Sequence, residues 1–273
     1  MEPQLRHAVA DGVATVVIDH QAKRNAMTAD MWRALPPLLT ALAADPAVRA
    51  LVLTGAGDTF CAGADISSLR EEPARAQELA VRAEEALAAF PKPTLAAVRG
   101  YCVGGGCQLA AACDLRFADE GAVFAVTPAK LGIVYPASTT RRLVSLVGPS
   151  TAKYLLFSGE SIDTGRALRS GLVDEVLPAG ELQGRVTEFT RILAARSLLT
   201  QAAAKEFASP AAGADGPGGA DAGAAREVHW AEQMRASGDT AEGVAAFLER
   251  RQPRFAWTPP EPEVPATPTA PLR

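Results

Sequence analysis

The sequence is poor in the residues that build metal centres and disulfide frameworks. It contains four cysteines, none in a Cys-x-x-Cys pair, and three histidines, which lie far apart at positions 7, 20 and 229. Zinc sites and disulfide scaffolds need these residues in larger numbers and at regular spacings. We therefore expect neither a bound metal nor a disulfide network.

The chain also lacks an excess of basic charge. It has 27 Lys and Arg residues against 31 Asp and Glu residues, a net charge of -4, and no long basic run. Nucleic-acid-binding proteins carry a basic patch or stripe, so nucleic acid is not an expected partner. An anionic ligand would have to be bound by a few local groups.

No segment has the pattern of a secretory signal or a membrane anchor. The N-terminal residues lack a basic region followed by an apolar stretch and a small-residue cleavage site, which predicts a cytoplasmic protein. The most apolar stretch, residues 94–113, contains Arg99 and four glycines. We interpret it as a buried strand, a glycine turn and a buried helix, and we expect no membrane association.

What remains is an ordinary globular composition with a repeating pattern of strands and helices. The chain has 273 residues, of which 48% are hydrophobic, enough to bury a full core. Strands are predicted over residues 5–10, 13–18, 48–54, 94–98, 115–118 and 123–126, and helices over 29–44, 73–90 and 107–112. Pro36 and Pro37 are expected to interrupt the first helix. The alternation predicts an α/β fold.

Two segments depart from this pattern. Residues 208–225 are almost entirely Ala, Gly, Asp and Pro, and six prolines follow Trp257. Such segments cannot bury enough apolar surface to offset the entropy lost on ordering, so we expect both to be mobile. Between them, residues 224–251 predict a pair of helices, with Asp239 as an N-cap, that packs on the core or on a neighbouring subunit.

Two loops rich in small residues are candidates for a binding site. Residues 59–66 follow a predicted strand, and residues 100–109 place three consecutive glycines, Gly104, Gly105 and Gly106, before a buried helix. A turn of this kind exposes unpaired N–H groups at the positive end of the helix, where a negative oxygen can bind. Each loop alone is equally well explained as a tight turn.

Taken together, these loops and the rest of the chain resemble the crotonase (enoyl-CoA hydratase/isomerase) superfamily. The matching stretches are AKRNAM at 22–27, FCAGADI at 60–66, GGGCQL at 104–109 with CD at 113–114, SG at 158–159 with ALRSGLV at 167–173, and the C-terminal signature at 239–255. The resemblance implies a spiral of repeated ββα units with a C-terminal helical segment. It also implies an acyl-CoA thioester substrate, no permanently bound cofactor, and a homotrimer or a dimer of trimers.

The same resemblance divides the chain and assigns its site residues. It implies a spiral core over residues 1–200, a helical trimerisation segment over 201–257 that contains the insert at 208–225, and a proline-rich tail over 258–273. The backbone N–H groups of Ala64 and Gly105 would form an oxyanion hole for the thioester carbonyl. The residues expected to contact the CoA substrate are Lys23, Arg24, Ala26, Ala62, Gly63, Asp65, Ile66, Thr127 and Pro128.

Individual roles within this set remain open. Lys23 and Arg24 would meet the CoA phosphates, or would be ordinary solvated surface charges. Asp65 is expected to fix its own loop through hydrogen bonds to nearby N–H groups rather than to act as a base.

The sequence departs from a hydratase at two positions. Enoyl-CoA hydratases use two carboxylates, which the family places at the positions that match Gln108 and Pro128. A glutamine amide does not exchange a proton near neutral pH, and proline has no functional side chain. Strong hydratase activity is therefore not predicted.

The loop at 127–136, TPAKLGIVYP, resembles that of methylmalonyl-CoA decarboxylase-like members, and Tyr135 matches their tyrosine. Decarboxylation of a malonyl-type CoA ester suits a site without carboxylates, because only the enolate oxyanion has to be stabilised. Gln108 and Tyr135 would orient the substrate carboxylate, with Tyr135 or a water returning the proton. Alternatively, both side chains are polar groups satisfied within the packing of the fold.

Two further alternatives remain from the sequence. The enzyme could be a hydratase or isomerase that uses a carboxylate from the region of Glu71 and Glu72 or of Glu84 and Glu85. It could instead be a catalytically silent acyl-CoA-binding protein that keeps the oxyanion hole and has lost the acid and base.

Overall fold

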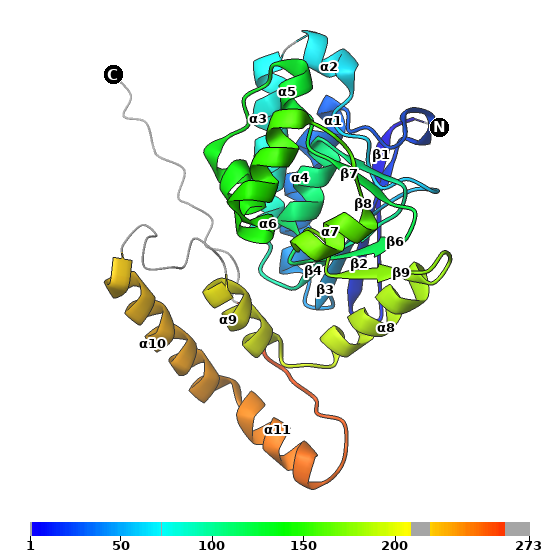
Figure 1. Cartoon of the computed structure of the whole chain (residues 1–273). Helices are drawn as coiled ribbons and strands as arrows, with labels where there is room; N and C mark the ends of the chain where they lie inside the picture. Colours follow the sequence, from blue (N-terminus) through cyan, green and yellow to red (C-terminus); the bar gives the residue numbers. More distant parts are fainter. Residues whose placement is uncertain (1, 72, 209–218, 260–273) are drawn as a thin grey trace, which may run out of the picture.

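The computed structural model describes residues 2–71, 73–208 and 219–259, which form two layers of sheet surrounded by helices (Figure 1). The larger sheet has the strand order β1(Gln4–Ala10), β2(Val13–Asp19), β3(Ala50–Gly55), β4(Thr94–Val98), β6(Leu115–Asp119) and β9(Glu175–Leu177). The smaller sheet has the order β5(Tyr101–Val103), β7(Val123–Ala125) and β8(Ile162–Asp163).

The strands pair as their sequences require. The β1 and β2 strands form the predicted antiparallel hairpin, whose two turn residues, Asp11 and Gly12, have φ angles of 51° and 80°. Positive φ at both positions is the geometry that Asp-Gly turns favour. From β2 to β9 all neighbours are parallel, and strands such as β4 are buried along their whole length. Continuous burial explains their apolar runs.

Helices follow the strands in the predicted alternation. They are α1(Ala29–Ala44), α2(Ile66–Glu71), α3(Pro73–Ala88), α4(Gly105–Ala112), α5(Pro128–Leu131), α6(Ala137–Ser158), α7(Thr164–Ser170), α8(Leu182–Ala194), α9(Leu198–Ala208), α10(Gly219–Ser237) and α11(Asp239–Leu248). A strand of the larger sheet is followed by one of the smaller sheet and then by a helix, as in β4, β5 and α4. This repetition confirms the predicted α/β spiral of ββα units with a helical C-terminal segment.

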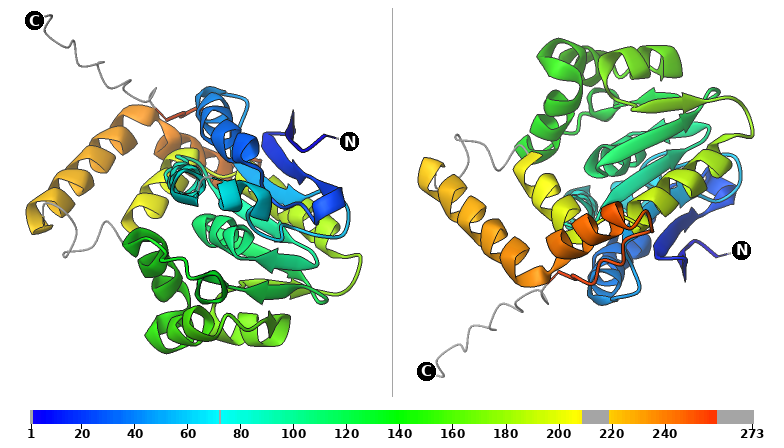
Figure 2. Two further views of the ribbon diagram at one scale, coloured as in Figure 1. Left: turned by 90° about the horizontal axis from the view of Figure 1, so that it is seen from above. Right: turned by 90° about the horizontal axis from the view of Figure 1, so that it is seen from below.

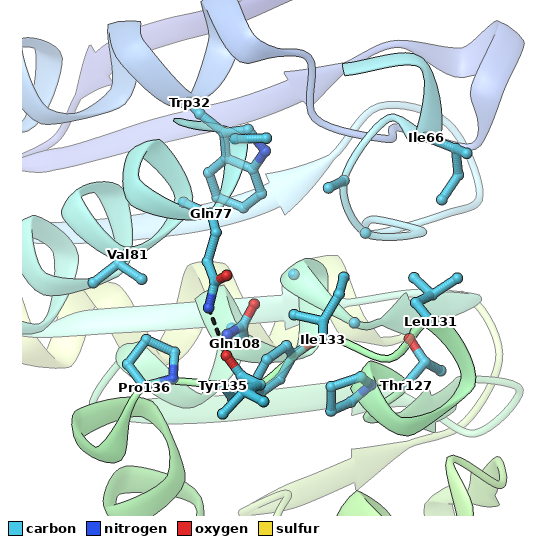
Figure 3. Close-up of a pocket in the computed structure, with 18 of the residues that line it drawn as sticks. Trp32, Ile66, Gln77, Val81, Gln108, Thr127, Leu131, Ile133, Tyr135 and Pro136 are labelled. Atoms are coloured by element: carbon cyan, nitrogen blue, oxygen red, sulfur yellow. Dashed lines mark hydrogen bonds between the residues drawn. The ribbon is translucent and has the colours of Figure 1, made fainter. Parts of the chain in front are cut away.

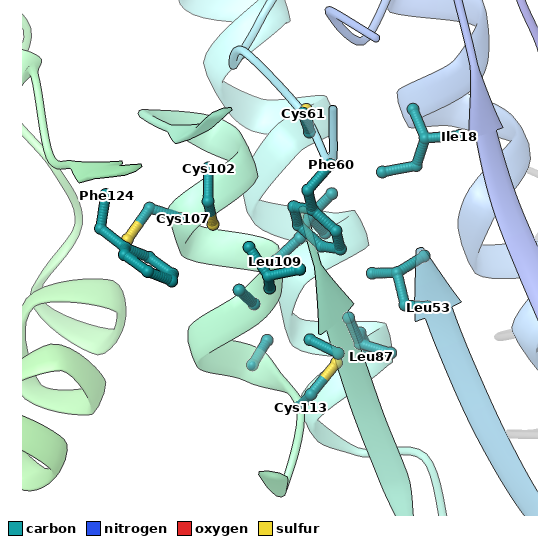
Figure 4. Close-up of a cluster of buried hydrophobic side chains, with 14 of the residues drawn as sticks. Ile18, Leu53, Phe60, Cys61, Leu87, Cys102, Cys107, Leu109, Cys113 and Phe124 are labelled. Atoms are coloured by element: carbon teal, nitrogen blue, oxygen red, sulfur yellow. The ribbon is translucent and has the colours of Figure 1, made fainter. Parts of the chain in front are cut away.

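The hydrophobic core fills the space between the layers, and all four cysteines belong to it (Figure 4). The thiols of Cys61, Cys102, Cys107 and Cys113 are buried and free. Burial raises the pKa of Cys61 and of Cys113 to about 12. The thiols of Cys61 and Cys113 are therefore protonated, apolar packing groups.

One predicted interruption is wrong. Helix α1 runs without a break through Pro36 and Pro37. Each proline removes one intrahelical hydrogen bond, but the helix buries Met31, Trp32, Leu35, Leu39 and Leu42 along one face. That apolar contact outweighs the local preference of the prolines to end the helix.

The predicted mobile insert is also partly wrong. Helix α9 includes Ala208, and α10 begins at Gly219, so residues 219–225 are helical. Their alanines are strong helix formers and extend the helix that continues to Ser237. Residues 209–218 of the insert, and residues 260–273 of the predicted tail, lie outside the described residues.

The predicted pair of C-terminal helices is present, but Asp239 is not their N-cap. Gly238 occupies the N-cap position of α11, with a φ of 75°. The buried carboxylate of Asp239 instead accepts a hydrogen bond of 2.6 Å from the Ser197 hydroxyl, just before α9. Asp239 thus ties α11 to the region that leads out of the core.

The C-terminal helices project from the sheets rather than covering them (Figure 2). Helix α10 is attached to α9 by a hydrogen bond of 2.7 Å from the Trp230 indole to the Glu206 carboxylate. The two C-terminal helices expose large apolar side chains, among them Val228, Met234, Val244, Phe247 and Leu248. Phe247 alone is 80% exposed.

The described part of the chain contains neither a membrane-spanning helix nor a cluster of metal-binding side chains. No helix there is long and apolar enough to cross a membrane. No group of three or more His, Cys, Asp or Glu side chains there could hold a metal ion.

Candidate active site

The two glycine-containing loops are joined by backbone hydrogen bonds. The Phe60 N–H donates to the Arg99 carbonyl at 2.7 Å, and the Cys61 N–H donates to the Tyr101 carbonyl at 2.8 Å. The Val103 N–H donates back to the Cys61 carbonyl at 2.9 Å. These bonds continue the smaller sheet beyond β5 and place residue 64 beside residue 105.

Close approach of the loops requires glycine at two positions. A Cβ on Gly106 would lie 2.3 Å from the Cys61 carbonyl oxygen, closer than any real contact. Gly63 has a φ of 109°, and a Cβ there would lie 3.1 Å from the Val103 carbonyl oxygen. Both glycines therefore serve the contact between the loops as well as the turns themselves.

The predicted oxyanion donors lie side by side. A Cβ on Gly105 would be 3.5 Å from the Ala64 nitrogen, and a Cβ on Gly63 would be 3.6 Å from the Gly105 nitrogen. Among the described residues, no group accepts a hydrogen bond from the N–H of Ala64 or of Gly105. Gly105 is also the first residue of α4, at the positive end of the helix. The pair can hold a negative oxygen.

A cavity of about 380 Å³ opens in front of these donors, between α3 and the loop that carries Tyr135 (Figure 3). The predicted site residues that line it are Ala62, Gly63, Ala64, Ile66, Gly105, Gln108, Thr127, Pro128 and Tyr135. Its other walls are mostly apolar, from residues that include Trp32, Ala80, Val81 and Ile133. Within the described part of the chain, no Asp, Glu, His, Lys or Arg lines this cavity.

Gln108 and Tyr135 supply polar groups to the inner wall of the cavity (Figure 3). Neither side chain is hydrogen-bonded to any described residue. The Tyr135 hydroxyl lies 3.9 Å from the position that a Cβ on Gly104 would take, beside the glycine turn. Burial, with smaller contributions from Cys107 and Glu84, raises the pKa of Tyr135 well above its ordinary value. The phenol is therefore neutral and able to donate.

The expected CoA-contacting loop near residue 24 lies beside this cavity rather than in its lining. The Lys23 ammonium binds the Asp65 carboxylate at 2.8 Å, and Asp65 also accepts from the Ser67 N–H at 3.0 Å. Burial alone would raise the pKa of Asp65, but these partners lower it below its ordinary value. The Arg24 guanidinium stacks 4.7 Å above the centre of the Tyr101 ring.

Ala26, also expected to contact CoA, is buried, and its carbonyl oxygen lies 2.7 Å from the His20 Nδ1 atom. The neighbouring Asn25 was not predicted to matter. Its buried amide donates to the carbonyls of Ala56 and Thr59, at 2.8 and 2.5 Å. Asn25 thus joins the loop near residue 24 to the loop at residues 59–66, with a φ of 58° that asparagine tolerates better than most residues.

Two further lining residues were also missed. Trp32 lies on the buried face of α1, and a Cβ on Gly105 would touch its ring at 3.0 Å. Gln77, on α3, donates to the Val134 carbonyl at 2.6 Å and so links two walls of the cavity (Figure 3). Trp32 has the helical spacing of a core residue and Gln77 that of a surface residue, so no sequence signal distinguished them.

The structure also places the carboxylates that were considered as an alternative acid or base. Glu84 and Glu85 do not line the cavity. Both carboxylates bind Arg142, and Glu84 also accepts from the Thr139 hydroxyl at 2.7 Å. Glu72 and the side chain of Glu71 lie outside the described residues.

Comparison with known proteins gives a consistent result over most of the chain. The family model described as "Enoyl-CoA hydratase/isomerase" matches residues 8–258. A 2,3-dehydroadipyl-CoA hydratase of Escherichia coli is 35% identical over 245 residues, 89% of this chain and 94% of that protein. A crotonyl-CoA hydratase of Syntrophomonas wolfei is 34% identical over 248 residues, with the same coverage of 89% and 94%.

Solved structures give the same answer for the fold. The crystal structure of an enoyl-CoA hydratase/isomerase family member superposes with a TM-score of 0.86 at 39% identity, over 95% of this chain and 100% of that one. An enoyl-CoA hydratase from Bacillus anthracis gives a TM-score of 0.85 at 30% identity, over 92% of this chain and 98% of that one.

Proposed function

The chain belongs to the enoyl-CoA hydratase/isomerase family, whose members act on acyl-CoA thioesters, and from this premise we propose that it decarboxylates a malonyl-type CoA ester. The observation that carries the proposal is the cavity in front of Ala64 and Gly105, which is lined by no Asp, Glu, His, Lys or Arg of the described residues. Hydration needs such groups at the substrate. Decarboxylation needs only a place for the negative charge that it generates.

The oxyanion donors supply that place. The bond between the α-carbon and the substrate carboxylate breaks, CO₂ leaves, and the electron pair of the bond forms the enolate of the thioester. Its oxygen accepts hydrogen bonds from the N–H groups of Ala64 and Gly105, which are unpaired and adjacent before substrate binds. One such donor contributes about 3 to 4 kcal/mol of transition-state stabilisation in an enzyme where it has been removed.

The neutral inner wall favours loss of CO₂ over retention of the carboxylate. Gln108 and Tyr135 orient the carboxylate by hydrogen bonds, but no lining cation among the described residues stabilises its charge. A glutamate in place of Gln108 or Pro128 would repel the substrate carboxylate. The α-carbon of the enolate then takes a proton from Tyr135 or from a water, and the phenolate or hydroxide left behind regains a proton from solvent.

The remaining parts of the chain fit a soluble acyl-CoA enzyme assembled from several copies. Lys23 and Arg24 contact the CoA phosphates, with CoA present as part of the substrate and no resident cofactor. The spiral core over residues 1–200 carries the site, and the segment over 201–257 forms a homotrimer, or a dimer of trimers, in the cytoplasm. Support for an interface comes from the exposed Val244, Phe247 and Leu248 of α11.

A second candidate is hydration or double-bond isomerisation, which the names of the relatives favour, because several are enoyl-CoA hydratases at 31% to 36% identity. It would need a carboxylate that reaches the cavity from outside the described residues or after a rearrangement. A third candidate is an acyl-CoA-binding protein without turnover.

One experiment separates the three candidates. The purified protein is incubated with methylmalonyl-CoA, while CO₂ release is measured, and separately with crotonyl-CoA, while the loss of enone absorbance is followed. We expect CO₂ release and at most slow hydration. Hydration at about 10 s⁻¹ or more without CO₂ release would favour the second candidate. Calorimetric binding of both thioesters with no turnover would favour the third.

A further inference from the structure

A buried carboxylate lies directly behind the inner wall of the cavity. Glu84 is 2% exposed and follows Val81, a cavity-lining residue, by three positions on α3, so both point to the same side of the helix. One carboxylate oxygen accepts the Thr139 hydroxyl at 2.7 Å, and the other binds the Arg142 guanidinium. Each oxygen thus has its own partner, and Glu84 does not line the cavity itself.

The partners of Glu84 lie at the start of α6, immediately after Tyr135. Thr139 and Arg142 belong to the first two turns of that helix, and Pro136 alone separates Tyr135 from it. Glu84, Tyr135 and Gln108 also line one small hollow on the far side of the wall. Glu84 therefore connects α3 to the segment that determines where the Tyr135 ring lies.

The contact between α3 and α6 at Glu84 is charged and hydrogen-bonded, although an apolar contact would be enough to pack the two helices together. An apolar side chain of the same size would pack α3 against α6 without the large cost of removing a carboxylate from water. Burial does raise the pKa of Glu84, against the effects of Thr139 and Arg142. Directional hydrogen bonds, unlike apolar packing, prevent the first turn of α6 from sliding or rotating relative to α3.

We propose that Glu84 is a positioning residue, which holds the Tyr135 hydroxyl at the substrate cavity by anchoring Thr139 and Arg142. The role of that hydroxyl at the substrate rests on the proposed function. The position of the ring does not, and it can be measured without any turnover.

The measurement uses the small number of tyrosines. The chain has three, Tyr101, Tyr135 and Tyr154, so a protein labelled with carbon-13 only at the ζ carbon of its tyrosines gives three signals. Tyr135→Phe removes and thereby identifies the signal of interest. Spectra are compared for the parent, for Glu84→Gln and for Thr139→Val, which removes one hydrogen bond to Glu84 and leaves the ion pair intact.

A matched control lies on the same helix. Glu78→Gln removes a carboxylate that pairs with Arg82 at 2.6 Å on the exposed face of α3. We expect Glu84→Gln and Thr139→Val to shift or broaden the Tyr135 signal, while the signals of Tyr101 and Tyr154 stay in place. Glu78→Gln should move none of the three.

Turnover of the substrate that the parent converts provides a second readout. Glu84→Gln should lower kcat by about 10 to 100-fold, the size expected from misplacing a reacting group by about 1 Å, with a smaller change in KM. In a Tyr135→Phe background the same substitution should change kcat less than about twofold, because the two residues act as one unit. Glu84→Asp, which keeps the charge, should recover part of the loss.

The possible outcomes separate the two claims. A Tyr135 signal that is unmoved in both variants, or an equal loss of kcat with and without the Tyr135 hydroxyl, would overturn the role of Glu84. If Glu84→Gln fails to fold, Thr139→Val decides by the same criteria. If the signal moves but kcat does not, or if the parent has no turnover, the positioning role stands and the proposed role of Tyr135 fails.

Discussion

Adding a single methyl group at Gly106 should separate the two oxyanion loops. The Cβ of an alanine there would lie 2.3 Å from the Cys61 carbonyl oxygen and 2.8 Å from the Cys61 Cβ. Ordinary contacts begin at about 3.4 Å, so the loops must move apart by about 1 Å. The new Cβ belongs to helix α4 and collides with the backbone of Cys61, and neither can rotate away as a flexible side chain would.

The movement should lower both activity and stability, because it disturbs hydrogen bonds that the Cys61 backbone forms. It forms hydrogen bonds of 2.8 and 2.9 Å with Tyr101 and Val103, which place Ala64 beside Gly105. A misplacement of about 1 Å typically costs about 100-fold in rate, and overpacking of this kind costs about 1 to 3 kcal/mol in stability. We therefore expect Gly106→Ala to lower kcat by about 100-fold.

The assay compares kcat, the dissociation constant for CoA and the thermal unfolding midpoint of Gly106→Ala with those of the parent. Gly184→Ala in α8 is the matched control, because a Cβ there meets nothing within 4 Å. It should stabilise the helix by up to about 1 kcal/mol and leave kcat unchanged. A folded Gly106→Ala protein with the kcat and midpoint of the parent would refute this account of the loops.

Three further predictions follow from separate parts of the structure. Gly105→Pro removes the N–H donor at the first position of α4, and Gly105→Ala is its control, because both add a Cβ that lies 3.0 Å from the Trp32 ring but only alanine keeps the N–H. With folding checked by circular dichroism, kcat of the proline variant should fall by about 100-fold or more relative to the alanine variant, the equivalent of about 3 kcal/mol. Because the folded pKa of Asp65 is lowered, its pair with Lys23 contributes to stability above about pH 4 and loses that contribution as pH falls. Asp65→Asn should cost about 0.5 to 1 kcal/mol at pH 7, and progressively less as the pH falls below about 4, in denaturant titrations. Truncation after Trp257 should leave the oligomeric state in light scattering unchanged, with a loss in stability below about 1 kcal/mol.

The features that sequence could predict are those that depend on local rules. The three consecutive glycines at the start of α4 and the small residues around Ala64 are needed by the backbone itself, so their pattern is visible in the local sequence. The parallel strands were visible for a similar reason, since burial on both faces leaves a continuous apolar run. The apolar runs predicted the α/β class, whereas the ββα spiral and the donor roles of Ala64 and Gly105 were implied by the resemblance that the two loops help to carry.

The features that were missed depend on contacts distant in sequence. Glu84 is one of three glutamates on the Ala-rich helix α3, and what distinguishes it is its contact with Thr139, 55 positions away. Asn25 likewise reaches Thr59, 34 positions away. Asp239 has the residue type and the position expected of an N-cap, but its carboxylate accepts a hydrogen bond from the Ser197 hydroxyl instead. Local preference could not reveal these partners.

The central claim, that neutral groups at Gln108 and Pro128 favour decarboxylation over hydration, is tested most directly by restoring the carboxylates. Gln108→Glu combined with Pro128→Glu would place an acid and a base in the cavity, because both positions line it. CO₂ release from methylmalonyl-CoA and hydration of crotonyl-CoA are measured in the parent and in this double variant. We expect the parent to release CO₂ faster than it hydrates, and the double variant to shift towards hydration. A parent that hydrates crotonyl-CoA at about 10 s⁻¹ or more and releases no CO₂ would contradict the claim.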